Sequence, residues 1–217
     1  NLIVLDESGS MSSIYNQASM NGKVEAVYPS PVIGMIGTIE KDKQMTLDFK
    51  RADATIYLLG DLKDDISCSE YLYSYRGIKL SHTPYFDLDK ESNMQKALSD
   101  LINQGLIESA HDVSEGGIFI SVLESAMCRE FGFDLFTGGE IRLDSFLFGE
   151  SQGRVVVTVK EGKENDFIDM LNISGVACCA IGSVRADGEI TVDDEPFGKV
   201  ANYKSLYDNA ISDILDK

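Results

Sequence analysis

Basic residues are scarce in this sequence. Against 36 Asp and Glu it has 19 Lys and Arg and two His, so the formal net charge is −17 at pH 7. Nucleic acids and anionic membrane surfaces are bound chiefly through Lys and Arg. We therefore expect no nucleic-acid partner and no membrane partner. A small anionic ligand is not excluded, because Mg²⁺ and helix N-termini supply positive charge locally.

The sequence also lacks a cysteine framework and a long apolar run. Its four cysteines show no C-x-x-C spacing, and the adjacent pair at 178 and 179 is poorly placed to form a bridge. This usage is typical of a reduced, cytoplasmic protein. The sequence contains no signal-peptide pattern and no run of about 18 apolar residues, so we expect no membrane-spanning segment.

Length and composition predict a globular chain with one sizeable core, with or without an appendage. The chain has 217 residues, of which 43% are hydrophobic, and shows no internal repeat. It opens without Met on a strand-like apolar run at residues 2–5. We expect it to be part of a longer protein whose remaining part lies N-terminal.

The stretch at residues 109–118 is the most informative one. It predicts the end of a strand turning sharply into an amphipathic helix. Ser114 suits the N-cap, and Gly116 and Gly117 let a ligand or another backbone come close. Asp112 and Ser114 beside free helix N–H groups could hold a metal-bound phosphate. An ordinary capped turn beside a buried His111 is an equal alternative.

Two other polar stretches each allow a functional and a simpler interpretation. Residues 6–21 are rich in Ser, Gly and Asn and either wrap a ligand or form a mobile loop, with the loop favoured. The prolines of residues 28–31 indicate a boundary. Glu150 and Arg154 flank a turn before a Val-rich run, where a structural ion pair is favoured over a catalytic role.

The remaining pattern predicts alternating strands and helices, typical of an α/β protein. Val156 falls in the strongest strand, and Leu206, Ile211, Ile214 and Leu215 are expected to face inward from a terminal helix. Strands are predicted at residues 32–39, 54–59, 130–136, 155–159 and 176–182, with 189–192 closing a hairpin on the last of these. Helices are predicted at residues 69–73, 88–104, 164–171 and 203–215.

Four motifs in order carry a resemblance to a known family. They are Pro-x-Pro-Val-Ile-Gly-Met-Ile-Gly at residues 29–37, Ile-Tyr-Leu-Leu-Gly at 56–60, His-Asp-Val-Ser-Glu-Gly-Gly at 111–117, and Leu-Phe-Gly-Glu-Ser-Gln-Gly-Arg-Val-Val-Val at 147–157. Together they resemble the phosphoribosylformylglycinamidine synthases of the aminoimidazole ribonucleotide (AIR) synthetase superfamily. The resemblance implies the tail of an N-type domain at residues 1–28 and a C-type α/β (α+β) domain, a mixed sheet with packed helices, at residues 29–217.

The resemblance also implies ATP-dependent amidine formation on formylglycinamide ribonucleotide in purine biosynthesis. The cofactors would be ATP and Mg²⁺, and the partners would be the N-terminal half of the synthetase and a glutaminase domain or subunit. Asp112 would bind the metal, and Gly9, Ser114, Gly116 and Gly117 the nucleotide. Ser13 would contact the substrate, with Ser12 as the alternative.

The family pattern leaves three points open. No catalytic residue is assigned, because the family's catalytic histidine lies outside this stretch and His111 does not inherit its role. Ser10 or Met11 stands where the family has a metal-binding Asn, which puts that ligand in doubt. The alternatives are a thiamine-phosphate kinase or selenophosphate synthetase of the same superfamily, against which residues 148–154 argue, and a non-catalytic structural module.

Overall fold

The computed structural model describes residues 16–18, 24–26, 34 and 36–215, which fall into two compact units divided after Asp42. In the first unit, strands β1 (Asn16–Ala18) and β2 (Val24–Ala26) pair antiparallel. Residues 16–18 are therefore a strand and not the predicted loop. Gly9, Ser13, the predicted strand at 2–5 and the predicted domain boundary lie outside the described residues.

The predicted strand at 32–39 is wrong for the residues of it that are described. Residues 34 and 36–39 have no regular structure, and Ile36 and Ile39 are exposed. High β-propensity reflects packing on a half-buried sheet, and these side chains are not buried.

The second unit, Lys43–Lys217, is built on a mixed seven-stranded sheet flanked by helices. Its sheet order is β4-β6-β3-β7-β5-β8-β9, antiparallel except for the parallel pair β5 and β8. The strands are β3 (Thr55–Leu59), β4 (Ile107–Asp112), β5 (Gly132–Leu135), β6 (Val155–Val159), β7 (Cys178–Arg185), β8 (Glu189–Val192) and β9 (Glu195–Lys199). The helices are α1 (Leu88–Asn103), α2 (Gly117–Met127), α3 (Leu143–Phe148), α4 (Glu164–Ser174), α5 (Val200–Asn209) and α6 (Ser212–Leu215), with a 3₁₀ turn at Lys41–Lys43 and a π-helical turn, η2, at Tyr71–Tyr75.

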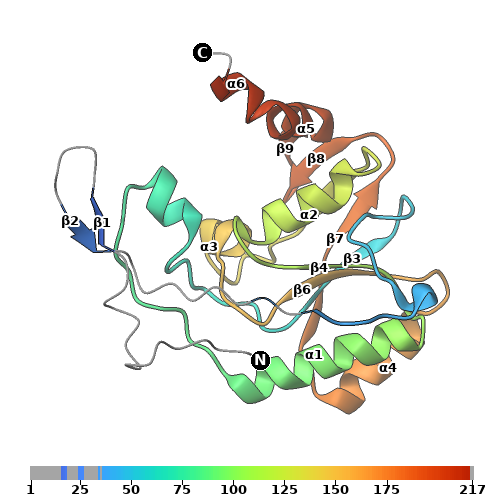
Figure 1. Ribbon diagram of the computed structural model, residues 1–217. Helices are drawn as coiled ribbons and strands as arrows, with labels where there is room; N and C mark the ends of the chain where they lie inside the picture. The colour runs from blue at the N-terminus through green and yellow to red at the C-terminus, as the bar shows by residue number, and fades with distance from the viewer. Residues whose placement is uncertain (1–15, 19–23, 27–33, 35, 216–217) are drawn as a thin grey trace. The chain divides into compact units, whose positions relative to one another are not determined.

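Strand periodicity divides the core between the two faces of the sheet. In β6, Val155, Val157 and Val159 pack with α1 and α4, while Val156 packs with α2. Figure 1 shows α1 and α4 side by side on one face and α2 with α3 on the other. This arrangement confirms the predicted fold class.

Helix α1 forms where the sequence predicts it. The Asp87 carboxylate accepts hydrogen bonds from the Asp89 and Lys90 backbone N–H groups at 3.1 Å and so caps the helix. Met94 and Leu101 are buried against the sheet. Among the described residues no helix is both long enough and apolar enough to cross a membrane.

Three predictions on the C-terminal half are wrong. The strand predicted to end at residue 182 continues to Arg185, because Val184 still pairs with Phe133. Strand β8 does not form a hairpin with β7, because β5 lies between them; β8 pairs instead with β9. The terminal helix is divided into α5 and α6, and the four apolar residues expected to face inward are 68–78% exposed.

Candidate functional site

Residues 113–116, which we call the ligand turn, connect β4 to α2. Helix α2 begins at Gly117, after the N-cap residue Gly116, whose φ is 83°. The prediction that Ser114 caps this helix is wrong, since Ser114 only accepts a hydrogen bond from the Gly117 N–H (3.1 Å) through its backbone carbonyl. Two successive glycines with positive φ turn the chain abruptly and leave Ser114 outside the helix.

Gly117 permits a close contact between two backbones. A Cβ atom at this position would lie 2.7 Å from the carbonyl oxygens of both Leu147 and Gly149. Any other residue would therefore push the start of α2 away from the loop that follows α3. The group that comes close to Gly117 is therefore the backbone of residues 147–149.

Glu150 and Arg154 do not form the predicted ion pair with each other. The Arg154 guanidinium is buried and donates to the carbonyl oxygens of Gly149 (2.7 Å) and Ser151 (2.9 Å). The Glu150 carboxylate instead accepts a hydrogen bond from the Gly116 N–H at 2.8 Å. Burial lowers the pKa of Arg154 to about 10, so the guanidinium is still charged at neutral pH.

An open groove runs between α1 and the ligand turn, and we call it the α1 groove. Asp112 and Ser114 both line it, so the structure brings together two of the residues selected from the sequence. The other lining residues come from α1 and the residue Phe86 before it, from the turn itself, and from the loop that leads into β6: Phe86, Glu91, Met94, Gln95, Leu98, Val113, Glu115, Glu150, Gln152, Gly153, Arg154 and Val155. The sequence patterns did not predict the contribution of α1, although Glu91, Gln95 and Leu98 share one face of that helix.

Asp112 presents its carboxylate to solvent, while its neighbour His111 is held inside. The Asp112 side chain is 77% exposed, and its Oδ1 lies 3.4 Å from the His111 Nδ1. The other ring nitrogen, Nε2, lies 2.7 Å from Glu124 Oε2. His111 is thus largely buried, with 12% of its side chain exposed, and has a carboxylate partner, which is close to the simpler interpretation of this residue.

The groove could supply one ligand to a divalent cation. Across the described part of the chain there is no cluster of three or more His, Cys, Asp or Glu side chains able to hold a metal. Mg²⁺ is often bound by one or two carboxylates together with phosphate oxygens and water. Asp112 fits that limited role, with the other ligands coming from a nucleotide and water.

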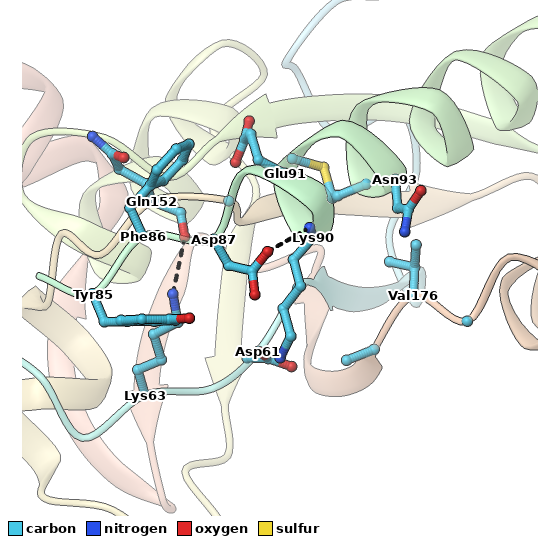
Figure 2. Close-up of a pocket in the computed structure, with 15 residues that line it drawn as sticks. Asp61, Lys63, Tyr85, Phe86, Asp87, Lys90, Glu91, Asn93, Gln152 and Val176 are labelled. Carbon is cyan, nitrogen blue, oxygen red and sulfur yellow. Dashed lines mark hydrogen bonds and ion pairs between the residues drawn. The ribbon is translucent and has the colours of Figure 1, made fainter.

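A smaller cavity of about 170 Å³ adjoins the groove and shares Glu91 and Gln152 with it. It lies at the N-terminal end of α1 (Figure 2). Lys90 Nζ is 2.7 Å from Asp61 Oδ2, and Lys63 Nζ donates a long bond, 3.4 Å, to the Gln152 carbonyl. The two lysines bring positive charge close to a groove whose charged lining side chains are mostly acidic.

Comparison with known proteins identifies the family. The sequence profile described as AIR synthase related protein, C-terminal domain, matches residues 51–195. The chain belongs to this family. Phosphoribosylformylglycinamidine synthase subunit PurL of Caldanaerobacter subterraneus subsp. tengcongensis is 37% identical over 182 residues, which are 83% of this chain and 24% of that protein. The corresponding subunit of Chlorobaculum tepidum is 37% identical over 201 residues, 87% of this chain and 26% of that protein.

The chain thus spans about a quarter of the length of these relatives. Among solved structures, PurL of Thermotoga maritima complexed with FGAR is similar with a TM-score of 0.65 and 16% identity, over 76% of this chain and 30% of that one. A thiamine-monophosphate kinase from Stenotrophomonas maltophilia is similar with a TM-score of 0.52 and 15% identity, over 73% and 55%. These two likenesses show the shared fold.

Proposed function

We propose that the chain is the C-terminal part of a phosphoribosylformylglycinamidine synthase. Residues 1–28 would belong to its N-type domain and residues 29–217 to its C-type domain. The observation that carries the proposal is the 37% identity to PurL subunits over more than four fifths of the chain. The kinase alternative is supported only by similarity of fold.

The proposed reaction converts a formamide into an amidine. The formamide oxygen of formylglycinamide ribonucleotide takes the γ-phosphoryl group of ATP, and ADP leaves. Ammonia, delivered by a glutaminase domain or subunit, then displaces the phosphate. Mg²⁺ would neutralise the phosphate charges, and the protein would contribute mainly by positioning and by electrostatic stabilisation.

Within this reaction the turn before α2 would bind a nucleotide. Asp112 would bind Mg²⁺ and Ser114 would contact the nucleotide, while Gly116 and Gly117 would shape the turn that presents these two side chains. The assignment of Gly9 to the nucleotide rests on the family resemblance alone. Ser13 would contact the ribonucleotide substrate. The exposure of Asp112 and its position with Ser114 in one groove support this assignment.

The charge of the groove favours a metal-bound nucleotide over a free one. Glu91, Asp112, Glu115 and Glu150 line it, against the single guanidinium of Arg154. A free triphosphate would be repelled by this lining, whereas its magnesium complex carries much less negative charge. Nucleotide binding should therefore depend on Mg²⁺.

Replacing Asp112 by Asn in the intact protein tests the proposal. The substitution keeps the shape and removes the charge, so affinity for Mg²⁺ with a non-hydrolysable ATP analogue should fall roughly ten- to a hundredfold. Isothermal titration calorimetry measures the affinity, and a melting curve should show unchanged stability.

The matched control is Asp194→Asn, which removes one carboxylate from the exposed turn between β8 and β9. It should bind the analogue like the unmodified protein. Unaltered binding by Asp112→Asn would leave the turn as a packing element. That outcome would favour the structural-module alternative, for which the Glu150 contact and the close approach at Gly117 are the motivating observations.

A further inference from the structure

One carboxylate oxygen joins three segments of the chain at the ligand turn. Glu150 Oε1 accepts hydrogen bonds from the Gly116 N–H and from the Glu70 N–H, both at 2.8 Å. Gly116 precedes α2, Glu70 precedes the helical turn η2, and Glu150 lies between α3 and β6. The three positions are far apart in sequence and meet at a single atom.

The surroundings fix this carboxylate in place. A Cβ atom at Gly149 would lie 2.5 Å from the carbonyl oxygens of Asp65 and Ser145, so the residue before Glu150 is packed closely against two other backbone segments. One residue earlier, the Phe148 ring stacks on Tyr71, with centroids 5.2 Å apart and an interplanar angle of 1°. Backbone and ring contacts therefore hold Glu150 against both amides.

Charge explains why this position carries a carboxylate. Backbone N–H groups at the start of a helix attract negative charge, and hydrogen bonds to an ionised acceptor are the stronger ones. At the start of α2 the Gly116 N–H is already bound by an anion of the protein itself, the Glu150 carboxylate. A ligand would thus meet the turn through the exposed side chains of Asp112 and Ser114, whose orientation depends on how the turn is held.

We infer that Glu150 is a positioning residue of the nucleotide site. By accepting the Gly116 and Glu70 N–H groups, it holds the turn in the geometry that presents Asp112 and Ser114 to the α1 groove. This inference rests on the proposed function, because it assumes that a Mg-nucleotide binds at Asp112. Glu150 also lines the groove, and its role in this inference is to hold the turn.

Two substitutions of Glu150 in the intact protein test separately the position and the charge of its carboxylate. Glu150→Gln keeps the length and an acceptor oxygen but loses the charge, so affinity for Mg²⁺ and a non-hydrolysable ATP analogue should fall less than about threefold. Glu150→Asp keeps the charge but withdraws the oxygen by one methylene. It should weaken binding roughly tenfold or more, and the amides of Gly116 and Glu70 should exchange hydrogen faster.

A double substitution tests whether Glu150 acts through Asp112. Residues that act through one another are not additive, so Glu150→Asp should cause little further loss of affinity in the Asp112→Asn protein. Glu161→Gln, an exposed change at the far end of β6, is the matched control and should alter neither affinity nor exchange.

The binding results show separately whether the inference on Glu150 fails and whether the proposed function fails. Weaker binding by Asp112→Asn together with normal binding by Glu150→Asp would overturn the inference alone. Tighter binding by Glu150→Asp would overturn it too, because Glu150 would then be competing with a ligand anion. Full additivity of the two changes would show that Glu150 does not act through Asp112. A wild-type protein that does not bind the Mg-nucleotide would refute the proposed function and this inference together.

Discussion

At the scale of single residues, the buried guanidinium of Arg154 predicts a specific cost of removal. Arg154→Met would fill a similar volume but would leave the carbonyl oxygens of Gly149 and Ser151 without their donors. We expect the free energy of unfolding to fall by about 1–3 kcal/mol for each carbonyl left unsatisfied. Chemical denaturation should show this loss, whereas Arg142→Met, at a 62% exposed side chain, should change stability little. Equal stability of the two variants would contradict the prediction.

The cysteines should differ in reactivity because they differ in burial. Burial raises the pKa of the Cys178 thiol to about 12 and also raises that of Cys179, while Cys68 and Cys128 are exposed. Iodoacetamide at pH 8.5 should therefore alkylate Cys68 and Cys128 well before the adjacent pair, as peptide mass spectrometry would show. Alkylation of all four at one rate would contradict this.

The same raised pKa has a consequence for stability. Folding keeps the Cys178 thiol protonated, so its contribution to stability is complete below the unfolded pKa of about 8.5. That contribution is lost as the pH rises toward about 12.

Residue types were easier to predict from the sequence than residue partners. The sequence selected Asp112, Ser114, Glu150 and Arg154, and all four line one groove. It did not predict that Glu150 binds backbone amides or that Arg154 binds carbonyls. Opposite charges four residues apart suggest a pair, but partners are set by which loops the sheet brings together.

At the scale of elements, β6 is the position where a buried charge should matter most. Val156 is 1% exposed and pairs with Leu58 on one side and His111 on the other. Val156→Asp would bury an unpaired carboxylate and should lower the free energy of unfolding by more than about 3 kcal/mol. Ala180→Asp, at an exposed position of β7, which β3 separates from β6 in the same sheet, introduces the same group and should cost far less. Similar melting temperatures for the two variants would show that β6 is not part of a dry core.

Elements with strong local signals were predictable, and their pairings were not. Helix α1 has a regular apolar face, and β6 is an unbroken run of β-formers, so both were recognised. The mistaken hairpin between β7 and β8 arose because β5, some 40 residues earlier, inserts between them. Sequence periodicity marks which residues are strands but carries no information on such long-range insertion. Exposure of Ile211 and Ile214 likewise depends on tertiary context.

At the scale of the whole molecule, acidity agrees with the proposed ligand. The net charge of −17 disfavours any polyanion. Acidic side chains also outnumber basic ones in the lining of the α1 groove. A nucleotide would be admitted as its magnesium complex, which makes metal dependence a property of the whole surface as well as of Asp112. The net charge could be read from the sequence because it does not depend on the fold, whereas the acidic side chains of the groove come together only in the structure.

The isolated chain should bind but not catalyse. Its second unit has its own two-faced core, so we expect purified material of residues 1–217 to unfold cooperatively on heating. The chain nevertheless covers about a quarter of the synthase relatives, and its described residues contain no group of three or more His, Cys, Asp or Glu side chains that could hold a metal, whereas phosphate transfer needs several metal and phosphate ligands. We therefore expect no ATP-dependent incorporation of ammonia into formylglycinamide ribonucleotide, measured as ADP release and amidine formation. A full-length relative assayed in parallel is the positive control, and amidine formation by the isolated chain would place the complete catalytic machinery within these residues.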